Sequence, residues 1–241
     1  MSQISNNDVR PAPARIICIL GMHRSGTSCL TGSLQNAGIA LGDIHTWNPY
    51  NKKGNRENQR FVDLHDSILE HNGGAWDEPP ASSVWRSEEK QAGRELLESY
   101  AEYPLFGFKD PRVLLVLEGW KQLYPDMEYI GSFRHPNAVA ESLRVRSDMP
   151  RNRALKLWYV YNKRMLQEYK KGPFPILCFD DSEENFHANL NRALDILGVL
   201  PKESGEKFWE ERLRGSQNAS QEKLPWRIGR LYRKLRSLAL R

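Results

Sequence analysis

Hydrophobic and polar positions along the chain fall into two kinds of pattern. Short apolar runs predict buried strands, and longer stretches in which apolar residues return every three or four positions predict amphipathic helices. The predicted strands are 15–20, 106–109, 127–133 and 176–179. The predicted helices are 27–37, 56–71, 88–103, 111–123, 137–146, 154–171 and 184–197.

Strands alternate with helices along most of the chain. This order predicts a three-layer α/β fold in which helices flank a central parallel sheet. A chain of 241 residues can form one domain with a substantial core, and no linker or repeat divides it. We expect a polar, disordered arm over 1–14, a domain over 15–221 and a basic helix within 222–241. Ligands of such sheets bind beyond the carboxyl ends of the strands.

The turn after the first predicted strand combines small polar residues with a cation, in the sequence Gly21-Met22-His23-Arg24-Ser25-Gly26-Thr27-Ser28. A glycine-bearing turn between a strand and a helix is the context in which backbone N–H groups bind a phosphate. Gly21 and Gly26 have the spacing of the nucleoside triphosphatase loop, but Thr27 stands where that loop has its lysine. The pattern therefore predicts a site for a phosphate-like anion other than magnesium-bound ATP.

A second anion-binding pattern follows the third predicted strand. Arg134 ends this strand, and Ser142 comes eight positions later in the next predicted helix. A guanidinium group binds phosphate in a bidentate manner, and a serine hydroxyl can add one hydrogen bond. With the loop around Arg24, this pair resembles the two signature motifs of the sulfotransferases that use 3′-phosphoadenosine 5′-phosphosulfate (PAPS). The later segments Lys109–Arg112, Cys178–Asp181 and Ile196–Val199 most resemble the bacterial carbohydrate-type branch of that family.

The resemblance implies a P-loop NTPase-like sulfotransferase fold and a role for each motif residue. It implies that the donor's 5′-phosphosulfate is bound by the loop residues His23, Arg24, Ser25, Gly26, Thr27 and Ser28. Arg134 and Ser142 would hold the 3′-phosphate. Arg24 would also stabilise charge on the departing 3′,5′-ADP, and Lys109 would contact the sulfuryl group. Transfer of this kind depends on positioning and charge neutralisation and requires no metal.

The hydroxyl acceptor needs a general base, and Glu57 is our candidate. The segment Gly54–Glu57 resembles the family's Gly-x-x-Glu, although Arg56 replaces the usual aromatic residue. An acid favoured by the first turn of a helix is the alternative interpretation of Glu57. His65, Asp63 and Asp110 are the other candidate bases, and Asp110 can equally be explained as a helix N-cap. Lys223 and Arg227 are candidates for a cation that closes over the 3′-phosphate.

Charge is concentrated at the C-terminal end. Residues 222–241 contain seven Lys or Arg and one Glu, whereas the whole chain has a net charge of +5. Apolar residues recur at helical spacing within this tail, at Ile228, Leu231, Leu235 and Leu238. Such a basic amphipathic helix either packs on the domain or docks peripherally on an anionic membrane or lipid-linked glycan. In nucleic-acid-binding proteins, basic residues are more often spread over the surface of the folded domain, whereas here the excess lies in the C-terminal tail. Nucleic acid is therefore not an expected partner.

Composition also bears on the cellular setting and on the acceptor. The three cysteines lie in apolar surroundings, and no run of about 20 apolar residues is present. These features, together with the lack of a signal-like N-terminus, predict a cytoplasmic protein. The branch resemblance implies a saccharide or glycolipid acceptor, facing the tryptophan-bearing segment 72–87. A nucleotide or sugar kinase and a non-catalytic nucleotide-binding module are the alternative functions.

Overall fold

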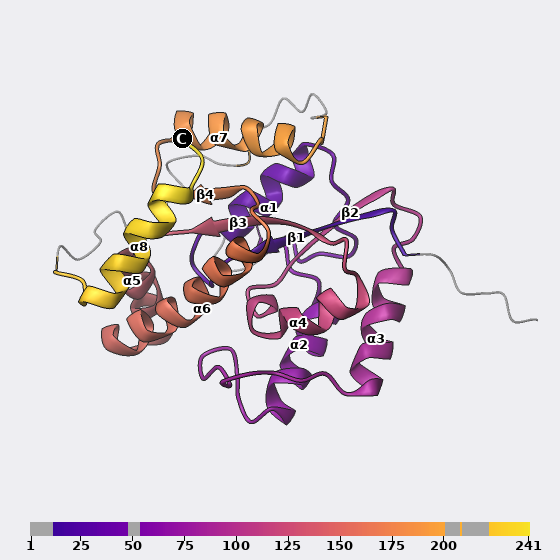
Figure 1. Ribbon diagram of the computed structural model, residues 1–241, viewed down its shortest axis with the longest axis horizontal. Coiled ribbons are helices and arrows are strands. Elements are labelled where there is room, and N and C mark those ends of the chain that lie inside the picture. The colour runs from indigo at the N-terminus through magenta and orange to yellow at the C-terminus, as the bar shows by residue number, and fades with distance from the viewer. Residues whose placement is uncertain (1–11, 48–53, 201–207, 209–221) are drawn as a thin grey trace, which may run out of the picture.

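A computed structural model describes residues 12–47, 54–200, 208 and 222–241 of the chain. The strands of this part are β1 (Arg15–Leu20), β2 (Leu105–Lys109), β3 (Glu128–Phe133) and β4 (Ile176–Cys178). The helices are α1 (Thr27–Asn36), α2 (Gln59–His71), α3 (Ser87–Glu98), α4 (Val113–Leu123), α5 (Pro136–Ser147), α6 (Arg151–Lys171), α7 (Glu183–Ile196) and α8 (Trp226–Leu238). Figure 1 shows how they are arranged around the sheet.

The described strands form one parallel sheet in the order β2-β1-β3-β4. After β1 the chain crosses to β2 on one side, and after β2 it returns to β3 on the other side of β1. The direction of winding therefore reverses between β1 and β3. In open α/β sheets, ligands bind at the carboxyl ends of the strands beside such a reversal. The loops that follow β1 and β3 are the ones that carry Arg24 and Arg134.

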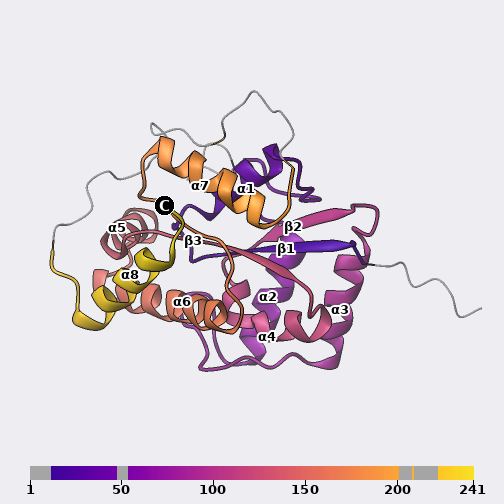
Figure 2. The ribbon, with the colours of Figure 1, turned by 45° about the horizontal axis from the view of Figure 1, so that its top comes forward.

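Alternate residues of β1 enter two separate apolar cores. Ile17 and Ile19 pack with α1 and α7 on one face of the sheet. Cys18 and Leu20 pack with α2, α4 and α6 on the opposite face. Figure 2 shows the sheet between these two layers of helices. The three-layer α/β architecture predicted from the sequence is confirmed.

The predicted elements are confirmed, and three helix starts differ from the prediction by two or three residues. Helix α6 begins at Arg151, three residues earlier than predicted. Helix α2 begins at Gln59, three residues later than predicted, because the Asn58 side chain accepts a hydrogen bond from the backbone N–H of Arg60. Glu57 therefore precedes the helix, and its interpretation as a first-turn acid was wrong. Helix α4 begins at Val113 and Arg112 occupies its N-cap position, so Asp110 is not the N-cap, although its carboxylate accepts from the Arg112 N–H in the turn before the helix.

The C-terminal helix α8 packs on the domain, chiefly against α6. Ile228, Leu231 and Leu235 are buried in the core on that side of the sheet. The proposal that this apolar face docks on a membrane was therefore wrong, because amphipathic spacing serves core packing here. No helix in the described part of the chain is long and apolar enough to span a bilayer.

Some predictions fall partly outside the described residues. Of the predicted N-terminal arm, only Ala12, Pro13 and Ala14 are described, and they lead directly into β1. Most of the segment between α7 and α8 also lies outside the described residues. The division of the chain into arm, domain and tail stays a prediction.

Candidate functional site

The loop between β1 and α1 is held in a tight, fixed conformation. Arg24 has a φ of 66° and Gly26 a φ of 81°, both in the left-handed region. A Cβ at Gly26 would lie 2.2 Å from the Phe179 ring, so this position requires glycine. The Ser132 hydroxyl of β3 donates to the Ser25 carbonyl at 2.7 Å, which ties the loop to the neighbouring strand. The backbone of the loop therefore leads rigidly into the N-terminus of α1.

The two sequence motifs meet through a direct hydrogen bond. Arg24 Nε donates to Ser142 Oγ of α5 at 2.8 Å, although the two residues are 118 positions apart. This contact lies where the loops after β1 and β3 come together, at the reversal in the sheet winding. The structure thus brings the loop and the Arg134–Ser142 segment into one site, as the sequence predicted.

The guanidinium of Arg24 lies in an electropositive environment. Burial, followed by the positive charges of Arg146 and Arg134, lowers its pKa from 12.5 to about 10. No carboxylate of the described residues lies within ion-pair distance of Arg24. Clustered cations of this kind repel one another until an anion joins them. The surroundings of Arg24 therefore favour a multiply charged anionic ligand.

Arg134 follows β3 and is only 6 % exposed. Its guanidinium carbon lies 5.6 Å from the centroid of the Phe179 ring, and its Nε is 3.5 Å from the Asp180 carboxylate. The indole N–H of Trp158 donates to the Arg134 carbonyl at 2.9 Å. These contacts fix both the backbone and the side chain of Arg134 beside the loop that carries Arg24.

An ion pair lies on the other side of the loop, at the end of β2. Lys109 Nζ is 2.6 Å from Glu57 Oε1 and 3.5 Å from Ser28 Oγ. Asn55 donates to the second oxygen of the same carboxylate at 2.8 Å. Lys109 is 2 % exposed, so β2 and the segment before α2 hold these two charges together in a mostly desolvated position. The predicted base and the predicted sulfuryl-binding lysine therefore face the same loop.

Behind this pair lies a fully buried network. The His65 Nε2 accepts from the indole N–H of Trp120 at 2.8 Å, so its Nδ1 carries the hydrogen that reaches Asp110 at 2.7 Å. Asp110 also pairs with Arg112 at 2.9 Å. Burial alone raises the pKa of Asp110, but the hydrogen bond from His65 and the charge of Arg112 outweigh it and hold the pKa well below its ordinary value.

The network accounts for the other candidate bases. His65 and Asp110 are both fully buried, and each is already bonded to structural partners. Asp63 is exposed and accepts from Gln59 of its own helix. None of the three lines the pocket that contains Glu57. Their positions therefore leave Glu57 as the candidate base that faces the pocket.

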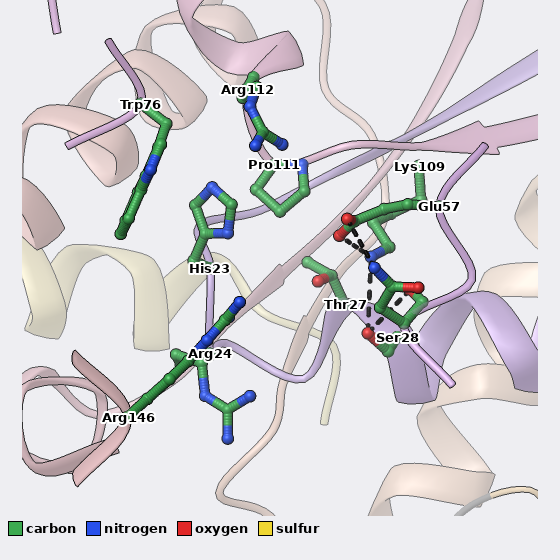
Figure 3. Close-up of a pocket in the computed structure, with 11 residues that line it drawn as sticks. His23, Arg24, Thr27, Ser28, Glu57, Trp76, Lys109, Pro111, Arg112 and Arg146 are labelled. Carbon is green, nitrogen blue, oxygen red and sulfur yellow. Dashed lines mark hydrogen bonds and ion pairs between the residues drawn. The ribbon is translucent and has the colours of Figure 1, made fainter. Parts of the chain in front are cut away.

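A polar pocket connects the loop, the Glu57–Lys109 pair and three residues that sequence reasoning did not assign (Figure 3). The unassigned residues are Arg112, Arg146 and Asn55. Arg146 is four positions after Ser142 on α5, a spacing that places both on one helix face and could have indicated it. The pocket is lined by His23, Arg24, Thr27, Ser28, Asn55, Glu57, Trp76, Lys109, Pro111, Arg112 and Arg146.

The tryptophans of the segment 72–87 have separate roles. Trp76 lines the pocket, in agreement with the predicted acceptor-facing surface. Trp85 is 5 % exposed and donates to the Val116 carbonyl from within the core, so its assignment to that surface was wrong.

Lys223 and Arg227 are exposed residues near the start of α8 that do not line the pocket. Among the described residues, no group of three or more His, Cys, Asp or Glu side chains could hold a metal ion.

Comparison with known proteins places this geometry in a known fold. Neither a family model nor a curated protein matches the chain. The chain is similar to the sulfotransferase domain from the curacin biosynthetic pathway, with 17 % identity, a TM-score of 0.58 and coverage of 95 % of this chain and 99 % of that one. It is also similar to the sulfotransferase domain from the Synechococcus PCC 7002 olefin synthase, with 22 % identity, a TM-score of 0.51 and coverage of 99 % and 93 %.

A third solved structure, sulfotransferase STF9 from Mycobacterium avium, has 14 % identity and a TM-score of 0.51, and the match covers 85 % of this chain and 67 % of that one. At these identities the likeness shows a shared fold. The predicted P-loop-like sulfotransferase fold is therefore confirmed.

Proposed function

We propose that the protein is a sulfotransferase that moves a sulfuryl group from PAPS to a hydroxyl group. The observation that carries this proposal is the hydrogen bond between Arg24 and Ser142, which joins the two anion-binding motifs into one site. A donor with phosphate groups at both the 3′ and 5′ positions needs two such clusters at a fixed separation. The resemblance of the motifs to those of PAPS-dependent enzymes and the shared fold support the same reaction.

The residues of the loop fit the phosphosulfate end of the donor. The Ser25 hydroxyl oxygen is buried and has no hydrogen-bond partner among the described residues. A buried hydroxyl in that state is expected to gain a partner when a ligand binds. Gly26 adopts the left-handed conformation that leads the loop into α1, and Thr27 begins this helix, whose N-terminus favours negative charge. Arg134 and Ser142 are assigned to the 3′-phosphate.

The proposed transfer is an in-line displacement. The acceptor oxygen forms a bond to sulfur while the bond between sulfur and the bridging oxygen of the donor breaks, and 3′,5′-ADP departs. Arg24 stabilises the charge that develops on the leaving oxygen. Glu57 takes the proton of the acceptor hydroxyl. Lys109, which holds Glu57 at 2.6 Å, is close enough to the loop to bind the sulfuryl group instead when the donor is present. The proposal assigns no metal ion to this step.

The acceptor is proposed to be a carbohydrate or a glycolipid precursor. This part rests on the resemblance of the motifs to the carbohydrate-type branch, because a fold alone does not determine a substrate. The expected cytoplasmic location rests on the composition of the chain and not on this resemblance. The polar pocket beside Glu57 is the place where such an acceptor would present its hydroxyl.

Replacing Arg134 with alanine tests the donor site. We expect Arg134→Ala to lower the affinity for 3′,5′-ADP by about 100-fold, because charged hydrogen bonds to the 3′-phosphate are lost. The affinity for 5′-ADP should fall by less than about threefold. Calorimetry measures both affinities. Arg144→Ala is a matched control, since Arg144 lies on α5, the helix that follows Arg134 and carries Ser142, is exposed and pairs with Glu141. Equal weakening of both nucleotides by Arg134→Ala would contradict the assignment. The ratio of the two affinities within one variant is insensitive to partial unfolding.

A further inference from the structure

The side chain of His23 points away from the contact that its neighbour Arg24 makes, although both residues lie in the same loop. Arg24 contacts Ser142, whereas the His23 ring packs against Trp76 with the ring centroids 4.6 Å apart. Tyr161 flanks the same ring with a centroid distance of 6.2 Å. In Figure 3, the His23 ring lies between Trp76 and the side of the pocket that holds Glu57 and Lys109. His23 thus faces the space where an acceptor must enter.

The imidazole of His23 has an unused hydrogen-bonding atom. Its Nε2 is shielded from solvent and has no partner among the described residues. Burial and the positive charges of Arg112, Lys109 and Arg146 lower the pKa of His23 well below 6.5, so the ring is neutral near pH 7. A neutral imidazole can donate through one nitrogen and accept through the other. Because unpaired polar atoms are costly to bury, this ring is suited to a polar, uncharged ligand group.

Trp76 is held in place independently of its ring. The Tyr161 hydroxyl donates to the Trp76 backbone carbonyl at 2.8 Å. The adjacent Asp77 pairs with Arg153 of α6 at 2.9 Å. These contacts fix the backbone around Trp76 and leave its indole half-buried along the pocket wall. An indole face presented in this way is suited to an apolar ring face of a ligand.

We propose that Trp76 and His23 form the acceptor subsite and that the acceptor is a pyranose ring with at least two hydroxyl groups. The indole of Trp76 contacts the C–H face of the ring. The His23 imidazole hydrogen-bonds a hydroxyl other than the one that reacts, which leaves the reacting hydroxyl for Glu57. This inference rests on the proposed function, deepens it, and assigns His23 a second role besides its backbone position in the donor loop.

Acceptor use by the full chain tests the inference. The formation of 3′,5′-ADP from PAPS is measured with the methyl pyranosides of glucose, galactose and mannose, with cyclohexanol as a monohydric ring alcohol, and with phenol. At least one pyranoside is expected to give a kcat/KM about tenfold or more above that of cyclohexanol or phenol, because only it supplies the second hydroxyl. A preference for phenol or cyclohexanol would overturn the inference, as would turnover of none of the pyranosides by a protein that binds 3′,5′-ADP.

Four variants then locate the subsite. Trp76→Leu and His23→Phe are each expected to raise the acceptor KM by about tenfold, since the first removes the ring face and the second keeps a ring but removes both nitrogens. Trp76→Phe and His23→Gln should recover part of that loss. Trp226→Leu is the matched control, because Trp226 is an exposed tryptophan outside the pocket.

A second readout separates this inference from the proposed function. The affinity for 3′,5′-ADP should stay within about twofold of the original chain in Trp76→Leu and Trp76→Phe, because Trp76 is not assigned to any part of the donor. An unchanged acceptor KM in Trp76→Leu and His23→Phe would overturn the inference while leaving the proposed function in place. A chain that fails to bind 3′,5′-ADP at all would instead overturn the proposed function, and this inference with it.

Discussion

The two sides of the pocket differ in whether their cations have carboxylate partners. On the side of β1 and β3, the half-buried Arg24 lies near the positive charges of Arg146 and Arg134, and no described carboxylate pairs with it. On the side of β2, Lys109 pairs with Glu57, and Arg112 pairs with both Asp110 and Asp66. The first arrangement is completed by an added anion, whereas the second is already balanced within the protein.

This contrast separates Arg24, which has no described counter-charge and favours a ligand, from Asp110 and Arg112, whose mutual pairing supports the local fold. A half-buried charge without a counter-charge costs folding free energy, so the presence of Arg24 in a loop beside the sheet reversal favours a ligand site. Buried charges with short, directed partners support the local fold, and removing one partner leaves the other uncompensated. Substitutions of Arg24 and of Asp110 should therefore affect different quantities.

The largest effect on stability is expected from Asp110→Asn. Asp110 is fully buried and bonded to both His65 and Arg112, so loss of its charge should reduce the free energy of unfolding by about 3–5 kcal/mol. Urea denaturation measures this quantity. Asp63→Asn, at an exposed position of α2, should change it by less than about 0.5 kcal/mol. A loss below about 1 kcal/mol in Asp110→Asn would show that the network is not structural.

Arg24→Ala should give the opposite profile. We expect kcat/KM for PAPS to fall by about 10²–10³-fold, because the variant loses the half-buried cation that the proposed mechanism places at the leaving oxygen. The free energy of unfolding should stay unchanged or increase, since Arg24 has no described carboxylate partner and is destabilised by Arg146 and Arg134. Turnover assays and urea denaturation of the same preparation give both values. A large loss of stability would remove the contrast between the two sides.

A smaller effect is expected from Glu57→Gln. Turnover should fall by about 10²-fold, at the lower end of general-base effects, because sulfuryl transfer resembles phosphoryl transfer and depends mainly on positioning and charge. The affinity for 3′,5′-ADP should change by less than about twofold. Single-turnover kinetics and calorimetry measure the two quantities. If turnover stays intact, Glu57 is not the base.

The smallest effect is the pH dependence contributed by His23. Its pKa in the folded protein lies well below 6.5, so the unfolded chain binds a proton below that pH that the folded chain does not. Stability from this group is full above about pH 6.5 and falls as the pH is lowered. When the pH is lowered from 6.5 to 5.5, the free energy of unfolding of the original chain should fall by about 1 kcal/mol more than that of His23→Phe. If the free energies of unfolding of the original chain and of His23→Phe fall by the same amount between the two pH values, the burial of a neutral imidazole is contradicted.

Local patterns predicted the strands and the two anion-binding motifs because each lies within a few consecutive residues. The five apolar residues that follow Arg15 indicated β1. Arg134 follows β3 directly, and Ser142 lies on the next helix, α5, as the spacing of the two residues predicted. The start of α2 was missed because Asn58 was not identified as its N-cap. The network of His65, Asp110 and Trp120 could not be predicted, because it joins residues far apart in the sequence through tertiary packing.

Amphipathic spacing and aromatic content did not distinguish residues that pack in the core from residues that face a membrane or a ligand. The apolar residues of α8 fit a membrane-facing helix and a core-facing helix equally well, and only the packing against α6 distinguishes them. Trp76 and Trp85 likewise belong to one irregular segment, yet one lines the pocket and the other fills the core. Both distinctions depend on how distant elements pack, which no local pattern contains.

The central claim is that the site between β1 and β3 binds a nucleotide with a 3′-phosphate. Calorimetric titration with 3′,5′-ADP, 5′-ADP and magnesium-ATP, each with and without EDTA, tests this claim most directly. We predict that 3′,5′-ADP binds about 100-fold more tightly than 5′-ADP and that EDTA does not change its affinity. Preference for magnesium-ATP would contradict the account and favour a kinase, and binding of none of the three would contradict a nucleotide site of any kind.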